Sequence, residues 1–133
     1  ALSDDTLALL SAEKFDWAAT GDSVLHNSLR APENHVIATE LHSKHESLHR
    51  AYTFHNTKIK TFFRDDGLSD LIGFKYATWH SDDAVGDLLN HMVNIAKHSK
   101  DTKNTVISVI MDGENAWEYF PENAYHFLHN LYE

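Results

Sequence analysis

The sequence has 133 residues, the length of one ordinary domain, and its composition excludes several classes of protein. Its 11 lysines and arginines against 20 aspartates and glutamates give a net charge of −9 with histidine neutral, so neither nucleic acid nor a membrane surface is an expected partner. The absence of cysteine excludes disulfides and thiol catalysis. No apolar run approaches the roughly 18 residues that span a bilayer. The sequence starts with Ala1 and soon reaches the polar residues Ser3, Asp4 and Asp5, so no signal peptide is visible and we expect a cytoplasmic protein.

Four helices are predicted from capping residues that precede apolar positions at helical spacing. They begin after Ser3, after Ser69, after Ser81 and at Pro121. The third has the clearest periodicity, and its expected inward face consists of Val85, Leu88, Leu89, Met92 and Ala96. The last is expected to turn Phe127, Leu128 and Leu131 inward. Residues 35–52 are also interpreted as mostly helical.

Three apolar runs between these helices are predicted to be strands, at residues 17–20, 59–63 and 105–111. The last is β-branched and nearly continuous, as expected of a parallel strand that is covered on both faces. Strands that alternate with helices predict an α/β fold with about three β/α units on a parallel, partial barrel-like sheet. No linker or repeat divides the chain, so we expect a single domain over residues 1–133.

The two longer predicted strands both end in acidic turns. Arg64 and Asp65 follow one strand, and Asp112, Gly113 and Glu114 follow the other. Because sites in parallel α/β folds are built at the carboxyl ends of strands, these side chains are candidates for catalysis or binding. The alternative is an ordinary strand-to-helix turn, in which Asp-Gly is common.

Aromatic residues gather near the same acidic turns. Trp117 and Tyr119 follow Asp112, and Trp79 ends the helix that is predicted after Arg64 and Asp65. Aromatic rings beside carboxylates are typical of sugar-binding sites, where the rings stack on pyranose faces. The alternative for any single tryptophan is packing in the core.

The histidine-rich segment offers a metal site as a second interpretation. The string His45-Glu46-x-x-His49 matches the H-E-x-x-H pattern of zinc enzymes, and His55 stands where the extended pattern has its third ligand. The glycine that this pattern requires is replaced by Tyr52. We therefore expect adventitious zinc or nickel at these histidines, with a metallopeptidase that uses Glu46 as its base as the alternative.

Three segments resemble glycoside hydrolase family 57, the family of α-amylases, amylopullulanases and 4-α-glucanotransferases. Residues 111–119, from Met111 through Asp112-Gly113-Glu114 to Tyr119, resemble its D-G-E-N-x-W-E-Y-Y segment. Residues 63–74 resemble its F-R-D-x-x-L-S-D-x-I-G-F segment, and residues 1–21 are similar to the stretch that follows its W-P-x-E-G motif. The segments occur in the family's order and extend over the whole chain.

The resemblance implies a retaining α-glucan hydrolase, similar to α-amylase and built on a seven-stranded β/α barrel. Residues 1–133 would correspond to the part between its nucleophile and general acid segments. Asp112 matches the general acid/base, whereas the nucleophile would lie before Ala1. The candidates for the second carboxylate are then Glu114, Glu118, Asp65 and Asp70, of which Glu114 is only two residues from Asp112. The expected substrate-binding residues are Arg64, Asp65, Trp79, Trp117, Glu118 and Tyr119.

The expected partners follow from the same resemblance. They are an α-glucan or maltooligosaccharide, with no cofactor required, and further copies of the chain that cover the exposed sheet edges. The alternative is a non-catalytic carbohydrate-binding remnant of such an enzyme.

Overall fold

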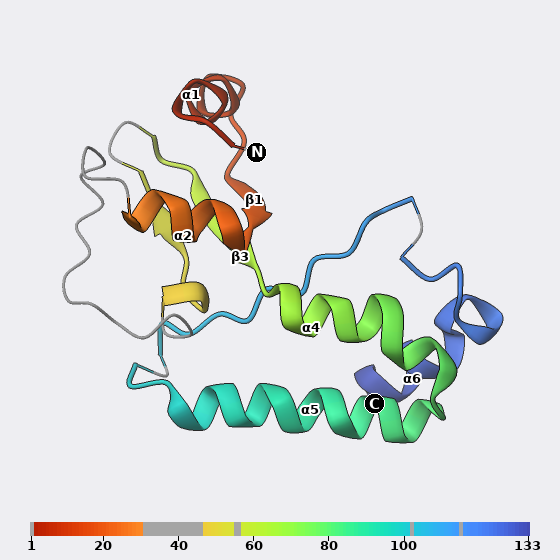
Figure 1. Cartoon of the computed structure of the whole chain (residues 1–133). Coiled ribbons are helices and arrows are strands. Elements are labelled where there is room, and N and C mark those ends of the chain that lie inside the picture. Colours follow the sequence, from red (N-terminus) through yellow and green to blue (C-terminus); the bar gives the residue numbers. More distant parts are fainter. Residues whose placement is uncertain (1, 31–46, 55–56, 102, 115) are drawn as a thin grey trace. The chain divides into compact units, whose positions relative to one another are not determined.

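The computed structural model describes residues 2–30, 47–54, 57–101, 103–114 and 116–133 (Figure 1). The chain divides into two compact units. The first comprises Ala1–Asp65 and Ser99–Ser108, and the second comprises Asp66–His98 and Val109–Glu133. The expectation of a single domain over residues 1–133 stays a prediction. Within the described part of the chain, no helix is long and apolar enough to cross a membrane.

The first unit contains a three-stranded sheet in the order β1-β3-β2. Its strands are β1 (Trp17–Gly21), β2 (Tyr52–Thr53) and β3 (Lys60–Arg64). β1 and β3 are parallel, whereas β2 is antiparallel to β3. The strands predicted at residues 17–20 and 59–63 are therefore confirmed, and the fold is mixed α/β. The sheet is not wholly parallel, because residues 52 and 53 form a strand where the end of a helix was predicted.

Two helices pack against this sheet. α1 (Asp4–Ala12) begins as predicted, since the Oγ of its N-cap Ser3 accepts the backbone N–H of Thr6 at 3.2 Å. α2 (Asp22–Arg30) follows β1 directly. Two clusters of buried residues connect helices to strands: Leu7 with Ala18 and Ile59, and Leu25 with Leu48 and Phe63.

Residues 105–111, which were predicted to be a third parallel strand, form no strand. In the first unit they make isolated backbone hydrogen bonds instead: the N–H of Val106 donates to the carbonyl of His49, and the N–H of Asp65 donates to the carbonyl of Ser108, each at 2.9 Å. The prediction was wrong because an apolar run reports that a segment is partly buried, not that its backbone pairs in a continuous ladder. Figure 1 shows this stretch as a long thread without an arrow.

The second unit is helical. α4 (Asp66–Asp70) continues through a π-helical turn, η1 (Leu71–Lys75), into a 3₁₀ turn, η2 (Tyr76–Thr78). α5 (Ser81–His98) follows, and η3 (Pro121–Ala124) leads into α6 (Tyr125–Tyr132). The helix predicted after Ser81 is confirmed. The helix predicted at Pro121 is confirmed in part, since Pro121 opens a 3₁₀ turn and the α-helix begins at Tyr125. The helix predicted after Ser69 begins earlier, at Asp66, so Ser69 lies inside it and does not cap it.

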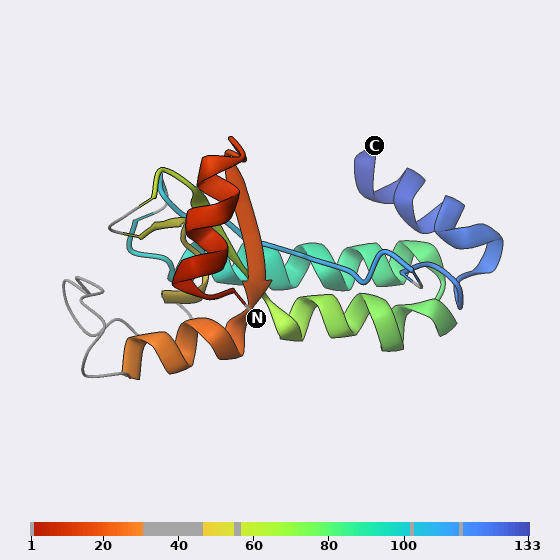
Figure 2. The ribbon, with the colours of Figure 1, turned by 90° about the horizontal axis from the view of Figure 1, so that it is seen from above.

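The core of this unit lies between α5 and its neighbours. Figures 1 and 2 both show α4 and η1 running alongside α5. Tyr76 is 1% exposed and donates its hydroxyl hydrogen to Asp87 at 2.8 Å, and burial together with this bond raises its pKa. On α5 itself only Ala84, Val85 and Leu88 are buried. The predicted inward face was therefore wrong at Leu89 and Ala96, which are exposed.

Candidate functional site

Asp112 and Glu114 lie in an exposed turn of the second unit. Both side chains are exposed, and a Cβ added to Gly113 between them would meet no atom within 4 Å. The two carboxylates are two residues apart in the same turn, which directly follows the extended segment of residues 105–111. A ligand can therefore reach this turn from solvent.

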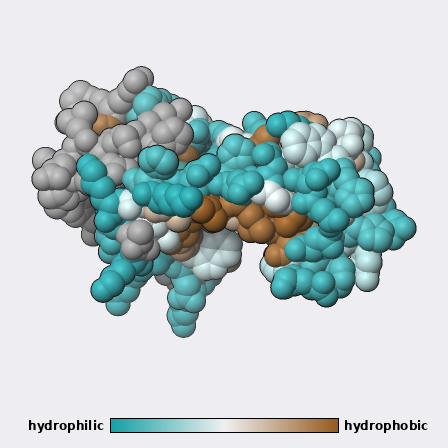
Figure 3. Space-filling view, turned by 90° about the horizontal axis from the view of Figure 1, so that it is seen from below, coloured by the Kyte–Doolittle hydropathy of each residue, from teal (hydrophilic) through white to brown (hydrophobic). Residues whose placement is uncertain are grey.

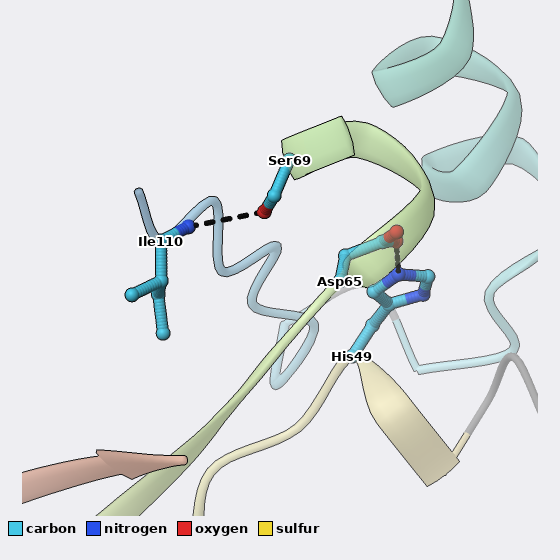
Figure 4. Close-up of polar contacts among 4 residues, drawn as sticks. All are labelled: His49, Asp65, Ser69 and Ile110. Carbon is cyan, nitrogen blue, oxygen red and sulfur yellow. Dashed lines mark hydrogen bonds and ion pairs between the residues drawn. The ribbon is translucent and has the colours of Figure 1, made fainter. Parts of the chain in front are cut away.

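The turn is anchored to helix α4 just before Asp112. The backbone N–H of Ile110 donates to the Oγ of Ser69 at 3.2 Å, and Ser69 is completely buried (Figure 4). The methyl carbon of Met111 lies 3.6 Å from the position of a Cβ on Gly73. These contacts fix the two residues that precede the candidate acid. Sequence analysis did not foresee this anchor, because it interpreted Ser69 as a helix cap.

The aromatic residues that follow the turn differ in their surroundings. Trp117 packs edge-on against Phe120 at 5.6 Å between ring centroids and lies 6.2 Å from Phe127, so it belongs partly to the core. Tyr119 is 72% exposed, and Glu118 is also exposed. Of these side chains, Tyr119 presents the most ring surface on which a sugar could stack.

Trp79 lies at the end of η2 in the same unit and is 37% exposed. Its ring packs edge-on against Tyr76 at 5.4 Å, and the Nζ of Lys75 lies 4.7 Å from its centroid. The contact with Lys75 is a cation–π interaction.

Arg64 and Asp65 belong to the first unit, at the carboxyl end of β3. Arg64 pairs with Gly21 across the parallel ladder, so β3 delivers these side chains to the strand end as the sequence predicted. Asp65 is only 8% exposed, and its Oδ2 accepts the Nε2–H of His49 at 2.7 Å (Figure 4). The assignment of Arg64 and Asp65 to substrate binding stays a prediction.

The bond between His49 and Asp65 is a contact at the end of β3 that sequence reasoning missed. The two residues are 16 positions apart, and no helix or strand period connects them. Sequence analysis had assigned His49 to zinc and Asp65 to a sugar. The available signal was composition alone: a histidine and an aspartate beside apolar residues, which need partners if they are buried.

The proposed metal ligands are described only in part. His45, Glu46 and His55 lie outside the described residues. His49 is described, and its Nε2 is engaged by Asp65, which leaves Nδ1 as its remaining ring nitrogen. Among the described residues, no group of three or more histidines, aspartates and glutamates could hold a metal ion. Zinc or nickel binding at His45, His49 and His55 stays a prediction.

The described residues define a mixed α/β protein with an exposed carboxylate turn followed by exposed aromatic side chains. The sequence model of glycosyl hydrolase family 57 matches residues 1–133. The chain therefore belongs to this family, which confirms the resemblance seen in the three sequence segments. No curated protein and no solved structure matches the sequence. Membership places the chain among the glycoside hydrolases.

Proposed function

We propose that the chain acts on α-glucans and maltooligosaccharides as an α-amylase-like retaining hydrolase, with Asp112 as the general acid/base. The observation that carries this proposal is the exposed carboxylate of Asp112 on a turn whose backbone is anchored at Ile110. A general acid has to reach the glycosidic oxygen and be held in position there. An exposed side chain on an anchored backbone meets both requirements.

Retention of anomeric configuration requires two carboxyl groups about 5 to 5.5 Å apart. One attacks the anomeric carbon, while Asp112 gives its proton to the departing glycosidic oxygen. Asp112 then takes a proton from the water that releases the sugar from the enzyme carboxylate. Within residues 1–133, Glu114 shares the turn with Asp112 and is the proposed second carboxylate.

Substrate binding in this proposal relies on the aromatic and charged residues that the resemblance to the family assigns to it. Tyr119, Trp117 and Trp79 would stack on sugar rings, and their exposed fractions support Tyr119 most strongly. Arg64, Asp65 and Glu118 would bind hydroxyl groups or orient the acid. No cofactor takes part. The parallel pair β1 and β3, with α2 between them in sequence, is proposed to be a β/α unit of the family's (β/α)7 barrel.

The first test is the Asp112→Asn variant assayed by reducing-sugar release from soluble starch. We expect a loss of about 10²- to 10⁴-fold in kcat, the usual contribution of general acid–base catalysis. With α-maltosyl fluoride as the substrate, the variant should lose less of its kcat, because fluoride leaves without needing a proton. Asp83→Asn is the matched control, since Asp83 is an exposed aspartate in the first turn of α5 and takes no part in the proposal.

Starch hydrolysis by Asp112→Asn at the wild-type rate would show that Asp112 is not the acid. Isothermal titration with maltoheptaose distinguishes a hydrolase from the remaining alternative, a protein that binds the sugar without cleaving it. Binding without any product from the wild-type chain would favour a non-catalytic carbohydrate-binding protein, for which the exposed ring of Tyr119 is the supporting observation.

A further inference from the structure

Helix α6 of the second unit carries a row of exposed aromatic rings, here called the aromatic row, which consists of Tyr125, His129 and Tyr132. These residues are spaced four and three positions apart, so they share one face of the helix. Tyr125 and Tyr132 are 58% and 83% exposed, and His129 is exposed as well. A contiguous group of exposed rings that polar groups border is typical of a binding surface.

The opposite face of α6 attaches the helix to the rest of its unit. Phe127 is 2% exposed, and its ring centroid lies 5.4 Å from that of Phe120 and 6.2 Å from that of Tyr76. The side-chain amide of Asn130 donates to the Oγ of Ser81 at 3.0 Å. Because α6 is packed on this side, the aromatic row lies on a supported helix and still faces solvent.

A hollow of about 510 Å³ lies beside the aromatic row. This volume is within the range of about 300 to 1,000 Å³ that is usual for small-ligand sites. The three rings and Leu128 line the hollow, and further polar groups come from Glu122, Asn123 and Glu133. Aromatic rings, carboxylates and a side-chain amide are therefore available to one ligand.

The rings and carboxylates of this hollow are already arranged with respect to one another. The rings of Tyr125 and His129 are nearly parallel, with an angle of 9° between their planes and 5.8 Å between their centroids. The Nε2 of His129 lies 3.3 Å from a carboxylate oxygen of Glu133, and the Nε2 of His126 lies 3.5 Å from one of Glu122. A carboxylate has about four acceptor sites, so each of these can also accept hydrogen bonds from a ligand.

The turn that brings Glu122 and Asn123 to the hollow has an unfavourable backbone conformation. The φ angle of both residues is 50°, and that of Ala124 is 65°, which is the left-handed region that favours glycine. Three successive non-glycine residues in this region cost free energy, and such strain is typical of functional sites. This strained turn supplies two of the polar groups of the hollow.

The groups around the hollow favour an uncharged ligand that is rich in hydroxyls. The two glutamates and the net charge of −9 disfavour an anion. A pyranose ring presents C–H groups that pack on an aromatic face and hydroxyls that bind carboxylates and amides. The aromatic row extends about 10 Å along the helix, which is longer than one sugar ring. Since the chain belongs to a glycoside hydrolase family, an oligosaccharide is the neutral ligand that fits these groups.

We propose that the aromatic row and its hollow form a binding site for maltooligosaccharides, in addition to the residues assigned to substrate binding above. The inference rests on the proposed function for the class of sugar, but it does not depend on the chemistry of Asp112. The site holds a glucan chain by stacking on the tyrosines and by hydrogen bonds to Glu122, Asn123 and Glu133. It contributes to binding and takes no part in bond cleavage.

An NMR titration with maltoheptaose tests the site residue by residue. The Asp112→Asn protein is used so that the sugar is not cleaved, and the backbone amide shifts are followed. We expect the amides of Tyr125, His129 and Tyr132 to shift until the site is saturated. The amide of Gly113 is followed in the same spectra, so binding at the turn is measured separately from binding at α6.

Variants of the hollow test which groups bind the sugar. Tyr132→Ala should raise the Kd at α6 about 10-fold, the effect of truncating a central contact residue. Tyr132→Phe keeps the ring and should stay within about 3-fold of the parent protein. Asn123→Gly keeps the left-handed backbone accessible and removes the amide, so the Kd should rise about 3-fold. Phe74→Ala is the control with an unchanged Kd, because Phe74 is 82% exposed in the same unit and does not line the hollow.

The proposal is overturned if the amides of α6 do not shift, or if Tyr132→Ala binds as tightly as its parent or no more weakly than Phe74→Ala. Shifts of these amides on dilution without sugar would show that the aromatic row contacts a second copy of the chain, which also overturns it. A shift at Gly113 alone would support sugar binding at the turn and reject only the site on α6. Saturable shifts at α6, in a chain whose wild type releases no sugar from starch, would support the site and overturn the proposed reaction.

Discussion

A single hydroxyl group, that of Ser69, anchors the backbone just before the candidate acid. Its side chain is 0% exposed, and it accepts the N–H of Ile110, a residue 41 positions away. Serine next to an aspartate indicated a helix cap, because the short side chain readily accepts a backbone N–H. That chemistry was identified correctly, but the donor comes from another part of the chain.

The Ser69→Ala variant should lose this anchor with little change in volume. The N–H of Ile110 would lose the acceptor that Ser69 provides at a partly buried position, so we expect the free energy of unfolding to fall by about 1 to 3 kcal/mol. Urea denaturation followed by tryptophan fluorescence measures the change. Ser23→Ala, at an exposed position of α2, should alter it by less than about 0.5 kcal/mol. Equal effects of the two variants would show that the bond from Ile110 contributes nothing.

At the same scale, sequence reasoning found the acidic residues but not their partners. Asp65 and Asp112 were both singled out because each follows an apolar run, and the structure places Asp65 in a buried contact and Asp112 in an exposed turn. Burial of one aspartate and exposure of the other depend on tertiary contacts from residues 47–49 and 105–110. No local pattern records such contacts.

Among the elements, α5 shows what hydrophobic periodicity can and cannot predict. Its position from Ser81 to His98 agrees with the predicted start and with the cationic residues at its end. Its apolar residues continue beyond the part that is packed, so Leu89 and Val93 are 45% and 48% exposed. The face that Figure 3 shows carries an apolar area among mostly hydrophilic residues. Periodicity predicts which residues share a face but not where the covering element ends.

Adjacent leucines on α5 provide a matched test of this difference. Leu88 is completely buried, whereas Leu89 is nearly half exposed. Leu88→Ala should lower the free energy of unfolding by about 2 to 5 kcal/mol, because it leaves a cavity in the core of the second unit. Leu89→Ala should cost less than about 1 kcal/mol, since water already reaches this side chain. Thermal denaturation of the two variants provides the comparison, and similar losses would contradict the burial seen here.

The strand predictions were confirmed only in part, because the composition of a segment does not report how its backbone is paired. β1 and β3 were found because apolar, β-branched and aromatic residues mark them, and they pair as expected. Residues 105–111 have the same composition but bind the rest of the chain at alternate positions through groups from residues 49, 65 and 69. Composition cannot distinguish a strand from an extended segment that is held by side chains and isolated backbone bonds.

For the whole molecule, the family was predictable because its evidence is spread along the chain. Three segments in the right order suggested glycoside hydrolase family 57, and the family match extends over residues 1–133. The arrangement of the sheet was less predictable, since an antiparallel β2 of two residues carries no detectable signal. Family membership therefore came from motifs, and the sheet topology required the structure.

Self-association is the expectation for the whole molecule that we now propose on structural grounds. In the described part of the first unit, β1 pairs only with β3, so its other edge is open. Phe15 and Trp17 beside this edge are 57% and 62% exposed. An open strand edge with exposed apolar side chains favours pairing with another chain. The net charge of −9 opposes association, but salt at about 0.15 M screens charges that lie more than about 8 Å apart.

Sedimentation velocity at increasing protein concentration tests the proposal. We expect the sedimentation coefficient to rise with concentration for the wild-type chain and to stay at the monomer value for Trp17→Lys, since a lysine on an edge strand opposes pairing. Phe74→Lys is the control, because Phe74 is 82% exposed but belongs to the second unit and not to the sheet. If both lysine variants reduce association equally, exposed aromatic surface in general drives it. A wild-type chain that stays monomeric at every concentration would show that the open edge of β1 is not an interface between copies.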